Sequence, residues 1–205
     1  MRIVLLADES FARREIEMLR RLEVGLLSQG HRVCLALPEA MLRESDALSL
    51  GSPTPYRLRG GPISRTHRIR QFLDRLDFED SESSTDRAID VVHVFGEQAW
   101  GFAARLATRV DAALVVECWS LAALHEASVL HRYLDPSATR TLWLAPSESM
   151  GRIAAEAMPK ARIETCHWGV HIDEHPHHRD HARRHLVTQS EQRIVADEPV
   201  EEETG

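Results

Sequence analysis

The chain has 205 residues, 43% of them hydrophobic, and a net charge of −7 at pH 7. This length and apolar content suit a globular chain of one domain or a little more. The acidic balance argues against a nucleic-acid-binding protein, and no run of about 18 apolar residues is present that would cross a membrane. The opening MRIVLLA is short and is followed at once by Asp8 and Glu9, unlike a signal peptide. We therefore expect a cytoplasmic protein.

The three cysteines, Cys34, Cys118 and Cys166, lie in apolar, strand-like segments with no paired spacing. An odd number of unpaired cysteines is typical of reduced thiols in the cytosol. We expect all three to be buried in the core.

Strand and helix patterns alternate from the amino terminus. Arg2–Ala7 is a continuous apolar run, typical of a central parallel strand. From Phe11 onward, apolar residues recur every third or fourth position, which predicts a helix ending at Gly30. His31–Leu37 is the next predicted strand, and Thr54–Leu58 is a candidate short edge strand.

A basic amphipathic helix is predicted over Arg65–Leu76, with arginines at 65, 68, 70 and 75. A solvated helix face is the favoured interpretation. Contact of these arginines with phosphate, or of the helix with a membrane surface, stays open as the alternative. The acidic, serine-rich stretch Asp77–Arg87 is interpreted as a surface loop.

The second half of the chain continues the alternation. The predicted strands and helices are Asp90–Gly96, Gln98–Thr108, Ala112–Glu117, Leu121–Tyr133, Thr141–Ala145, a helix capped by Ser147 or Ser149 and stopped by Pro159, and Ala161–Cys166. Thr141–Ala145 is rich in large apolar side chains, which predicts a strand buried on both faces. Gly169 would then permit a turn with positive φ.

Such alternation predicts an α/β fold, a Rossmann-like doubly wound parallel sheet of six to seven strands with helices on both faces. We expect this domain to span residues 1–170. Residues 171–205 are rich in histidine and then acidic, and we expect them to be a disordered tail.

Several strand ends resemble one known family. Four segments are similar to the amino-terminal domain of family-4 glycosyltransferases. They are L-x-x-x-G-H-x-V ending at Val33, D-V-V-H-V-F-G at 90–96, S-E-S at 147–149 and the turn at His167–His171. In that family the last turn usually reads Pro-Asn-Gly-Val-Asp, and here Gly169 and Val170 match. The resemblance implies the GT-B architecture, and transfer of a sugar from a nucleotide-sugar with retention at the anomeric carbon.

Candidate binding residues follow from the rule that open parallel sheets bind ligands at the carboxyl ends of their strands. Carboxylates, an imidazole and an indole at this edge would suit a sugar, because carboxylates accept hydrogen bonds from hydroxyls and aromatic faces cover a pyranose. Structural roles are the alternative for Ser147 as a helix cap, Trp119 in packing and His93 within the fold. The candidates are Asp8, Glu9, His93, Glu97, Glu117, Trp119, Ser147, Glu148 and Gly169.

Some expected features are missing from the sequence. The loop Asp8–Arg13 lacks the Gly-Gly that in the family lets backbone N–H groups approach the donor phosphates, and neither GxGxxG nor GxxxxGK[ST] occurs. The family's second, donor-binding domain and its paired glutamates are not in this sequence. We expect an acceptor-binding half that is inactive without a donor-binding domain, with the nucleotide-sugar as co-substrate and no cofactor. The expected partners are a sugar or glycan acceptor and a separate donor-binding domain or chain, and the alternative is a non-catalytic binding or regulatory module.

Histidines in the tail are weak candidates for metal ligands. His177, His181 and His185 are spaced four apart and would share one face of a helix. Without a Cys pair or an HExxH motif, we expect adventitious metal binding and no specific site.

Overall fold

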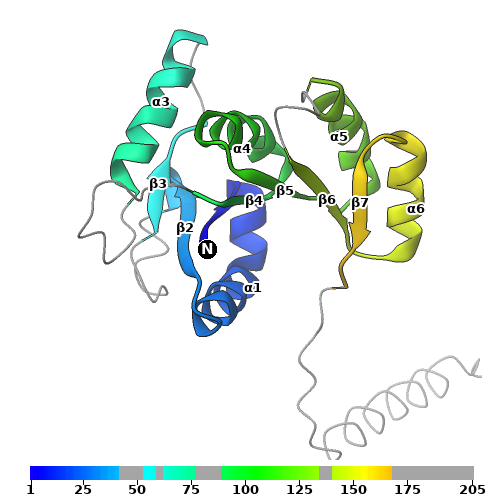
Figure 1. Cartoon of the computed structure of the whole chain (residues 1–205), viewed down its shortest axis with the longest axis horizontal. Helices are drawn as coiled ribbons and strands as arrows, with labels where there is room; N and C mark the ends of the chain where they lie inside the picture. Colours follow the sequence, from blue (N-terminus) through cyan, green and yellow to red (C-terminus); the bar gives the residue numbers. More distant parts are fainter. Residues whose placement is uncertain (42–52, 59–61, 77–88, 134–139, 168–205) are drawn as a thin grey trace, which may run out of the picture. The chain divides into compact units, whose positions relative to one another are not determined.

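In the computed structural model, the strands of the described residues form one parallel sheet of seven (Figure 1). Its strand order is β3-β2-β1-β4-β5-β6-β7, and every neighbouring pair is parallel. This confirms the predicted Rossmann-like α/β fold, with β3 at one edge and β7 at the other. The strands are β1 (Arg2–Ala7), β2 (Arg32–Pro38), β3 (Thr54–Tyr56), β4 (Val91–Phe95), β5 (Ala113–Glu117), β6 (Thr141–Ala145) and β7 (Arg162–Thr165).

The structure describes residues 1–41, 53–58, 62–76, 89–133 and 140–167. These residues all belong to one compact unit, Met1–His167. The predicted loop Asp77–Arg87, the turn at Gly169 and the tail at 171–205 lie outside the described residues. The boundary between domain and tail therefore stays a prediction.

Apart from β2 and β3, whose connection is described only as far as a 3-10 turn, a helix joins each strand to the next, as predicted. The bounds of the helices are α1 (Glu9–Ser28), a short 3-10 turn η1 (Glu39–Met41), α3 (Pro62–Arg75), α4 (Glu97–Val110), α5 (Leu121–Tyr133) and α6 (Glu148–Ala157). No helix in the described parts is both long and apolar enough to cross a bilayer.

The two faces of the sheet are covered unequally. The main apolar core joins one face of the sheet to α3, α4, α5 and α6, with Phe72, Trp100 and Trp143 among its largest side chains. Helix α1 packs on the opposite face, over β1 and β2, through buried Phe11 and Leu19 (Figure 1). Because one helix is about 10 Å wide and strands are spaced at about 4.8 Å, α1 covers only about two strands.

The α1 side of β4, β5 and β6 is covered by none of the described helices. On the side of α4 and α5 the residues of these strands are buried, apart from Thr141. On the other side Phe95 and Glu117, at the carboxyl ends, are buried, and the remaining residues are only half-buried. The half-buried residues are Val91, His93, Ala113, Val115, Leu142 and Leu144, which we call the open half-face. The prediction that Thr141–Ala145 is buried on both faces is therefore wrong, because the apolar run does not reveal which neighbours the strand has.

Two arginines of the basic helix α3 bond other parts of the domain, one buried and one at the surface. The buried Arg68 side chain donates hydrogen bonds to the backbone carbonyls of Arg57 and Leu58. Arg75 donates to Glu39 at 3.1 Å. Hydrogen bonds from Arg57 and then Arg75 hold the pKa of the Glu39 carboxyl below its ordinary value. Two of the four arginines on the predicted basic face therefore have partners within the domain, and Arg68 has a structural role that neither interpretation of the helix included.

Helix α1 carries a buried carboxyl group on its inner side. Glu23 is 6% exposed, and its Oε2 has no hydrogen-bond partner among the described residues. Burial raises the pKa of the Glu23 carboxyl above its ordinary value, against a smaller opposing effect of Arg20. A carboxyl whose folded-state pKa is raised costs stability when ionised, and that cost disappears as the pH falls.

Replacing this carboxyl should stabilise the protein. Glu23→Met keeps the side-chain size and helix propensity, and we expect it to raise the free energy of unfolding at pH 7 by about 1 kcal/mol, the lower end of the cost of an unpartnered buried acceptor. The gain should shrink as the pH falls toward 4.5, the ordinary pKa of the group. Urea denaturation at several pH values measures it, with Glu17→Met as the control, since the Glu17 side chain is 69% exposed. A Glu23→Met protein less stable than the wild type at pH 7 would contradict this account.

Candidate functional site

The strand order places the topological switch point between β1 and β4. The chain leaves β1 toward β2 and β3, then returns to the other side of β1 and continues outward through β4 to β7. Ligands of open α/β sheets bind beside the carboxyl ends of the strands at such a point. The residues after β1, β4 and β5 are therefore the first place to look for a site.

Asp8, directly after β1, bonds the first turns of the two helices that begin at this point. Its Oδ1 accepts a hydrogen bond of 2.8 Å from the backbone N–H of Phe11, in the first turn of α1. Its Oδ2 accepts one of 3.1 Å from the backbone N–H of Gln98, in the first turn of α4. Ser10 Oγ adds a bond of 2.8 Å to Oδ1, and Asp8 is only 1% exposed. One carboxylate thus caps two helices, a role that the sequence did not indicate.

Gly96 makes this arrangement sterically feasible. Its φ is +86°, and a Cβ built on it would lie 2.2 Å from Cγ of Asp8. Only glycine tolerates both the positive φ and the close approach. First-turn N–H groups of helices are natural partners for phosphates, and here one such donor from each of the two helices is given to Asp8. This agrees with the missing Gly-Gly in the loop that follows β1.

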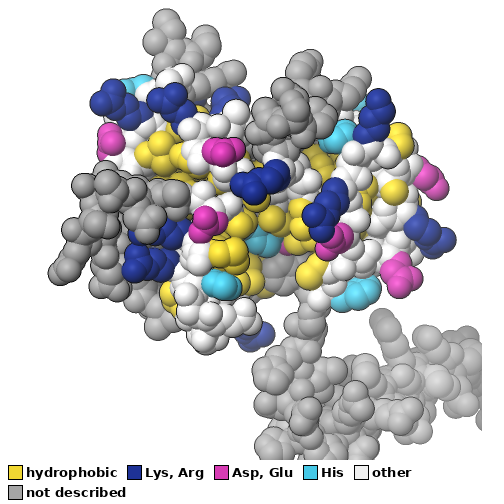
Figure 2. Space-filling view, viewed as in Figure 1, with side chains coloured by type: hydrophobic (Ala, Val, Ile, Leu, Met, Phe, Trp, Pro, Cys, Tyr) yellow, Lys and Arg dark blue, Asp and Glu magenta, His cyan; other side chains and the backbone are white. Residues whose placement is uncertain are grey.

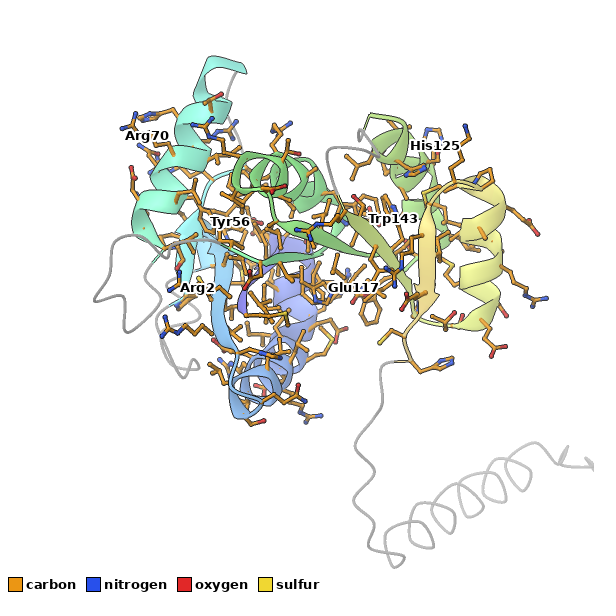
Figure 3. All side chains as sticks on the ribbon, in the orientation of Figure 1. Arg2, Tyr56, Arg70, Glu117, His125 and Trp143 are labelled. Carbon is orange, nitrogen blue, oxygen red and sulfur yellow. The ribbon has the colours of Figure 1, made fainter. Side chains whose placement is uncertain are left out.

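His93 and Glu117 form a hydrogen-bonded pair across β4 and β5. The register places His93 opposite Val115, so Glu117, two residues further on, lies on the same face of the sheet. His93 Nε2 is 2.8 Å from Glu117 Oε1, and the two side chains are 14% and 1% exposed (Figure 3 labels Glu117). Glu117 Oε2 has no hydrogen-bond partner among the described residues. A buried carboxylate oxygen in this state is rare in folded proteins, because leaving it unbonded is costly.

Aromatic rings pack beside the His93–Glu117 pair. The His93 ring lies 4.3 Å from that of Phe95, centroid to centroid. Phe11, at the start of α1, contacts Phe95 at 5.3 Å and Trp119 at 5.6 Å. The packing role considered for Trp119 in the sequence is therefore real, and it places the indole at the same edge as the carboxylates.

A second carboxylate lies on the rim. Glu97 Oε1 is 3.4 Å from Ser120 Oγ, which links the start of α4 to the start of α5. We call His93, Glu97, Glu117, Trp119 and Ser120 the carboxyl-edge cluster. Ser120 was not a candidate in the sequence, although its hydroxyl accepts from the N–H of Ala123 at 3.1 Å and a capping rule would have found it.

The remaining candidates have other roles or lie elsewhere. Ser147 Oγ accepts from the backbone N–H of Met150 at 3.2 Å, so it caps α6 as the alternative interpretation had it. Glu148 lies beside Gly151 and Thr165 around a shallow hollow on α6 and β7. Glu9 is on the solvent side of α1 and pairs with Arg13 at 3.0 Å. Gly169 and the tail histidines His177, His181 and His185 lie outside the described residues.

Metal ligands do not gather within the described part of the chain, where no three His, Cys, Asp or Glu side chains come together in a way that would hold an ion. The cysteines only partly follow the prediction. Cys34 and Cys118 are buried, and burial is the main cause that raises the pKa of each thiol to about 11. Cys166 is exposed, so the prediction that all three are buried is wrong. Cys166 directly follows β7, the edge strand of the sheet, where an apolar pattern in the sequence does not ensure burial.

Comparisons with known proteins give little beyond this geometry. No family model matches the sequence, and no curated protein matches it. Among solved structures, the chain is similar to the glycotransferase of kitacinnamycin, with a TM-score of 0.45 and 14% sequence identity. The similarity covers 85% of this chain and 53% of that one, so this chain spans about half the length of the structure it matches. A similarity at this level carries no information on activity or substrate.

The contact between Gly96 and Asp8 predicts a large effect of a single methyl group. Gly96→Ala forces a positive φ on alanine and drives its Cβ into the carboxylate, so we expect a loss of more than about 2 kcal/mol in the free energy of unfolding. Gly25→Ala is the control, because nothing lies within 4 Å of a Cβ built at Gly25. This helical substitution should stabilise the protein by about 0.5–1 kcal/mol. Equal stability of the two variants in urea denaturation would refute the proposed packing.

The cysteines should differ sharply in reactivity, because the thiolate is the reactive form and needs access to the reagent. At pH 8 a disulfide reagent such as DTNB should modify Cys166 rapidly in the folded protein. Cys34 and Cys118 should react only on unfolding. A fast phase that persists in Cys166→Ser would show that this assignment of the exposed thiol is wrong.

Proposed function

We propose that the chain is the acceptor-binding, amino-terminal half of a retaining, nucleotide-sugar-dependent glycosyltransferase. The observation that carries the proposal is the buried Glu117 carboxylate, held by His93, with one oxygen that no described residue bonds. It lies beside Trp119 and Glu97 at the edge of the sheet where ligands bind in this fold class.

The chemistry of the carboxyl-edge cluster suits a neutral polyhydroxylated ligand. Hydroxyl groups donate to carboxylate oxygens, and such bonds to charged acceptors are stronger than neutral ones. Glu97 and Glu117 both disfavour phosphates and other anions at this edge, most strongly at Glu117, which is 1% exposed. The charge pattern therefore favours a sugar acceptor over a nucleotide at this edge.

The proposal that this chain is only the acceptor-binding half of an enzyme rests on Asp8. In a sheet of this type the helix N-termini at the switch point are the natural position for a ligand phosphate, and Asp8 bonds one first-turn N–H of each helix. A nucleotide-sugar would then be held mainly by a second domain or a partner chain. Together with the resemblance at the strand ends, this supports a chain that completes an active site only with a donor-binding partner in the cytoplasm.

A non-catalytic binding module is the second candidate. Phe95 is at the position where the D-x-x-H-x-H strand pattern of the family has its second histidine. This departure favours a chain that kept the fold and lost part of the family's catalytic site. Both candidates bind a glycan at the same edge. They differ in whether adding a donor-binding domain and a nucleotide-sugar leads to sugar transfer.

Binding of sugars to the purified chain tests the proposal directly. Saturation-transfer NMR with a panel of mono- and disaccharides should identify at least one ligand. We expect Glu117→Gln to weaken its affinity by about 10-fold or more, which corresponds to losing a hydrogen bond to a charged group. Glu156→Gln, an exposed carboxylate on α6, is the matched control and should bind as the wild type does. A panel without any ligand, or equal affinity of both variants, would refute the proposal.

A further inference from the structure

A hollow lies at the amino-terminal ends of β5, β6 and β7, at the other ends of the strands from the carboxyl-edge cluster. Its volume is about 540 Å³, within the range of about 300–1,000 Å³ typical of small-molecule sites. Ala113, Val115 and Leu142 contribute apolar surface to its lining. All three belong to the open half-face, so they are half-buried in a sheet of a type that is usually covered on both faces.

Three cations surround this apolar surface. Arg140, Lys160 and Arg162 all line the hollow and are exposed to solvent. Figure 2 shows Lys and Arg side chains beside hydrophobic ones on this side of the molecule. The concentration of positive charge contrasts with the net charge of −7 of the whole chain.

The cations are incompletely neutralised. Arg162 pairs with Glu164 at 2.6 Å, and its side chain is still 74% exposed. Among the described residues, Arg140 donates only to the backbone carbonyl of Asp111, at 3.4 Å. Lys160 makes no ion pair with another described residue. The rim thus offers positive charge to a ligand, next to apolar surface that water wets poorly.

We propose that this hollow binds an anionic amphiphile, with its head group at Arg140, Lys160 and Arg162 and its hydrocarbon chain over Ala113, Val115 and Leu142. A small inorganic anion would leave the apolar floor wet, and a neutral hydrocarbon would leave the cations unused. An alkyl phosphate satisfies both parts. The ligand is either a free molecule or a lipid in a membrane surface, which share this chemistry.

The site does not depend on the proposed glycosyltransferase function. It lies at the amino ends of the strands, whereas the carboxyl-edge cluster lies at their other ends, and the two share no residue. A failure to detect sugar binding at Glu117 would therefore not affect the proposal for this hollow. A failure of the hollow to bind its ligand would likewise not affect the proposed glycosyltransferase function.

Dodecyl phosphate below its micelle concentration is the probe, titrated into the full chain by calorimetry. We expect a Kd of tens of micromolar, at least 10-fold weaker binding of octyl phosphate, since each methylene contributes roughly fourfold, and no measurable binding of inorganic phosphate. The double variant R140E/K160E should weaken dodecyl phosphate at least 10-fold. Arg14→Glu, the same charge change on an exposed arginine of α1, should have no effect.

Flotation with vesicles distinguishes the two sources of the ligand. Capture by phosphatidylglycerol-containing vesicles, lost in R140E/K160E, would assign a lipid surface, and binding of monomeric dodecyl phosphate alone would assign a free molecule. Equal binding by the wild type and R140E/K160E, inorganic phosphate binding as tightly as dodecyl phosphate, or no dodecyl phosphate binding below 1 mM (about 4 kcal/mol) would overturn the proposal. Chain-length dependence is measured on the wild type, so the test survives a variant that folds poorly.

Discussion

The arrangement of this protein depends on one carboxylate, that of Asp8. It follows the central strand β1 and accepts hydrogen bonds from the first turns of α1 and α4, which lie on opposite faces of the sheet. Helix N-termini carry unsatisfied donors and a partial positive charge, so a shared anion stabilises both helices and fixes their starts relative to each other. Gly96 is at the end of β4 because any larger residue would displace this carboxylate.

This constraint also shapes what the carboxyl edge can bind. With Asp8 bonded to both helices, the switch point carries its own anion, and the groups left around it are Glu97, Glu117 and His93. Glu117 lies in a nearly dry position, where its Oε1 is 2.8 Å from His93 Nε2. Its second oxygen needs a donor, and the hydroxyl of a sugar is one that brings no charge into the site.

Because the two faces of the sheet are covered unequally, the domain has room for two sites of different chemistry. Of the described helices, four close one face, whereas α1 alone packs on the other. The apolar strand residues left half-buried there extend from the carboxyl edge near His93 to the cationic rim at Lys160 and Arg162. A polar, acidic site and a basic, apolar site can therefore lie at opposite ends of the same strands without sharing a residue.

The sequence predicts the strands and helices well because their signals are local. The apolar run Arg2–Ala7, the helical spacing that ends at Gly30 and the cap at Ser147 each act within a few residues of the chain. What it misses depends on neighbours in space. The twofold capping by Asp8 joins positions 90 residues apart, the exposure of Cys166 depends on β7 being an edge strand, and the inward position of Arg68 depends on two carbonyls that precede α3. The pairing of His93 with Glu117 likewise requires the register of β4 and β5, although both residues were candidates.

Calorimetric titration of the chain alone with nucleotide-sugars and free nucleotides, beside whichever sugar the NMR panel identifies, tests the central claim most directly. Because Asp8 bonds a first-turn N–H of each helix at the switch point, the proposed function predicts no heat of binding for any nucleotide up to millimolar concentration, and measurable binding of the sugar. Micromolar binding of a nucleotide-sugar to the isolated chain would contradict it, because the switch point would then accept a phosphate in spite of the carboxylate at its centre.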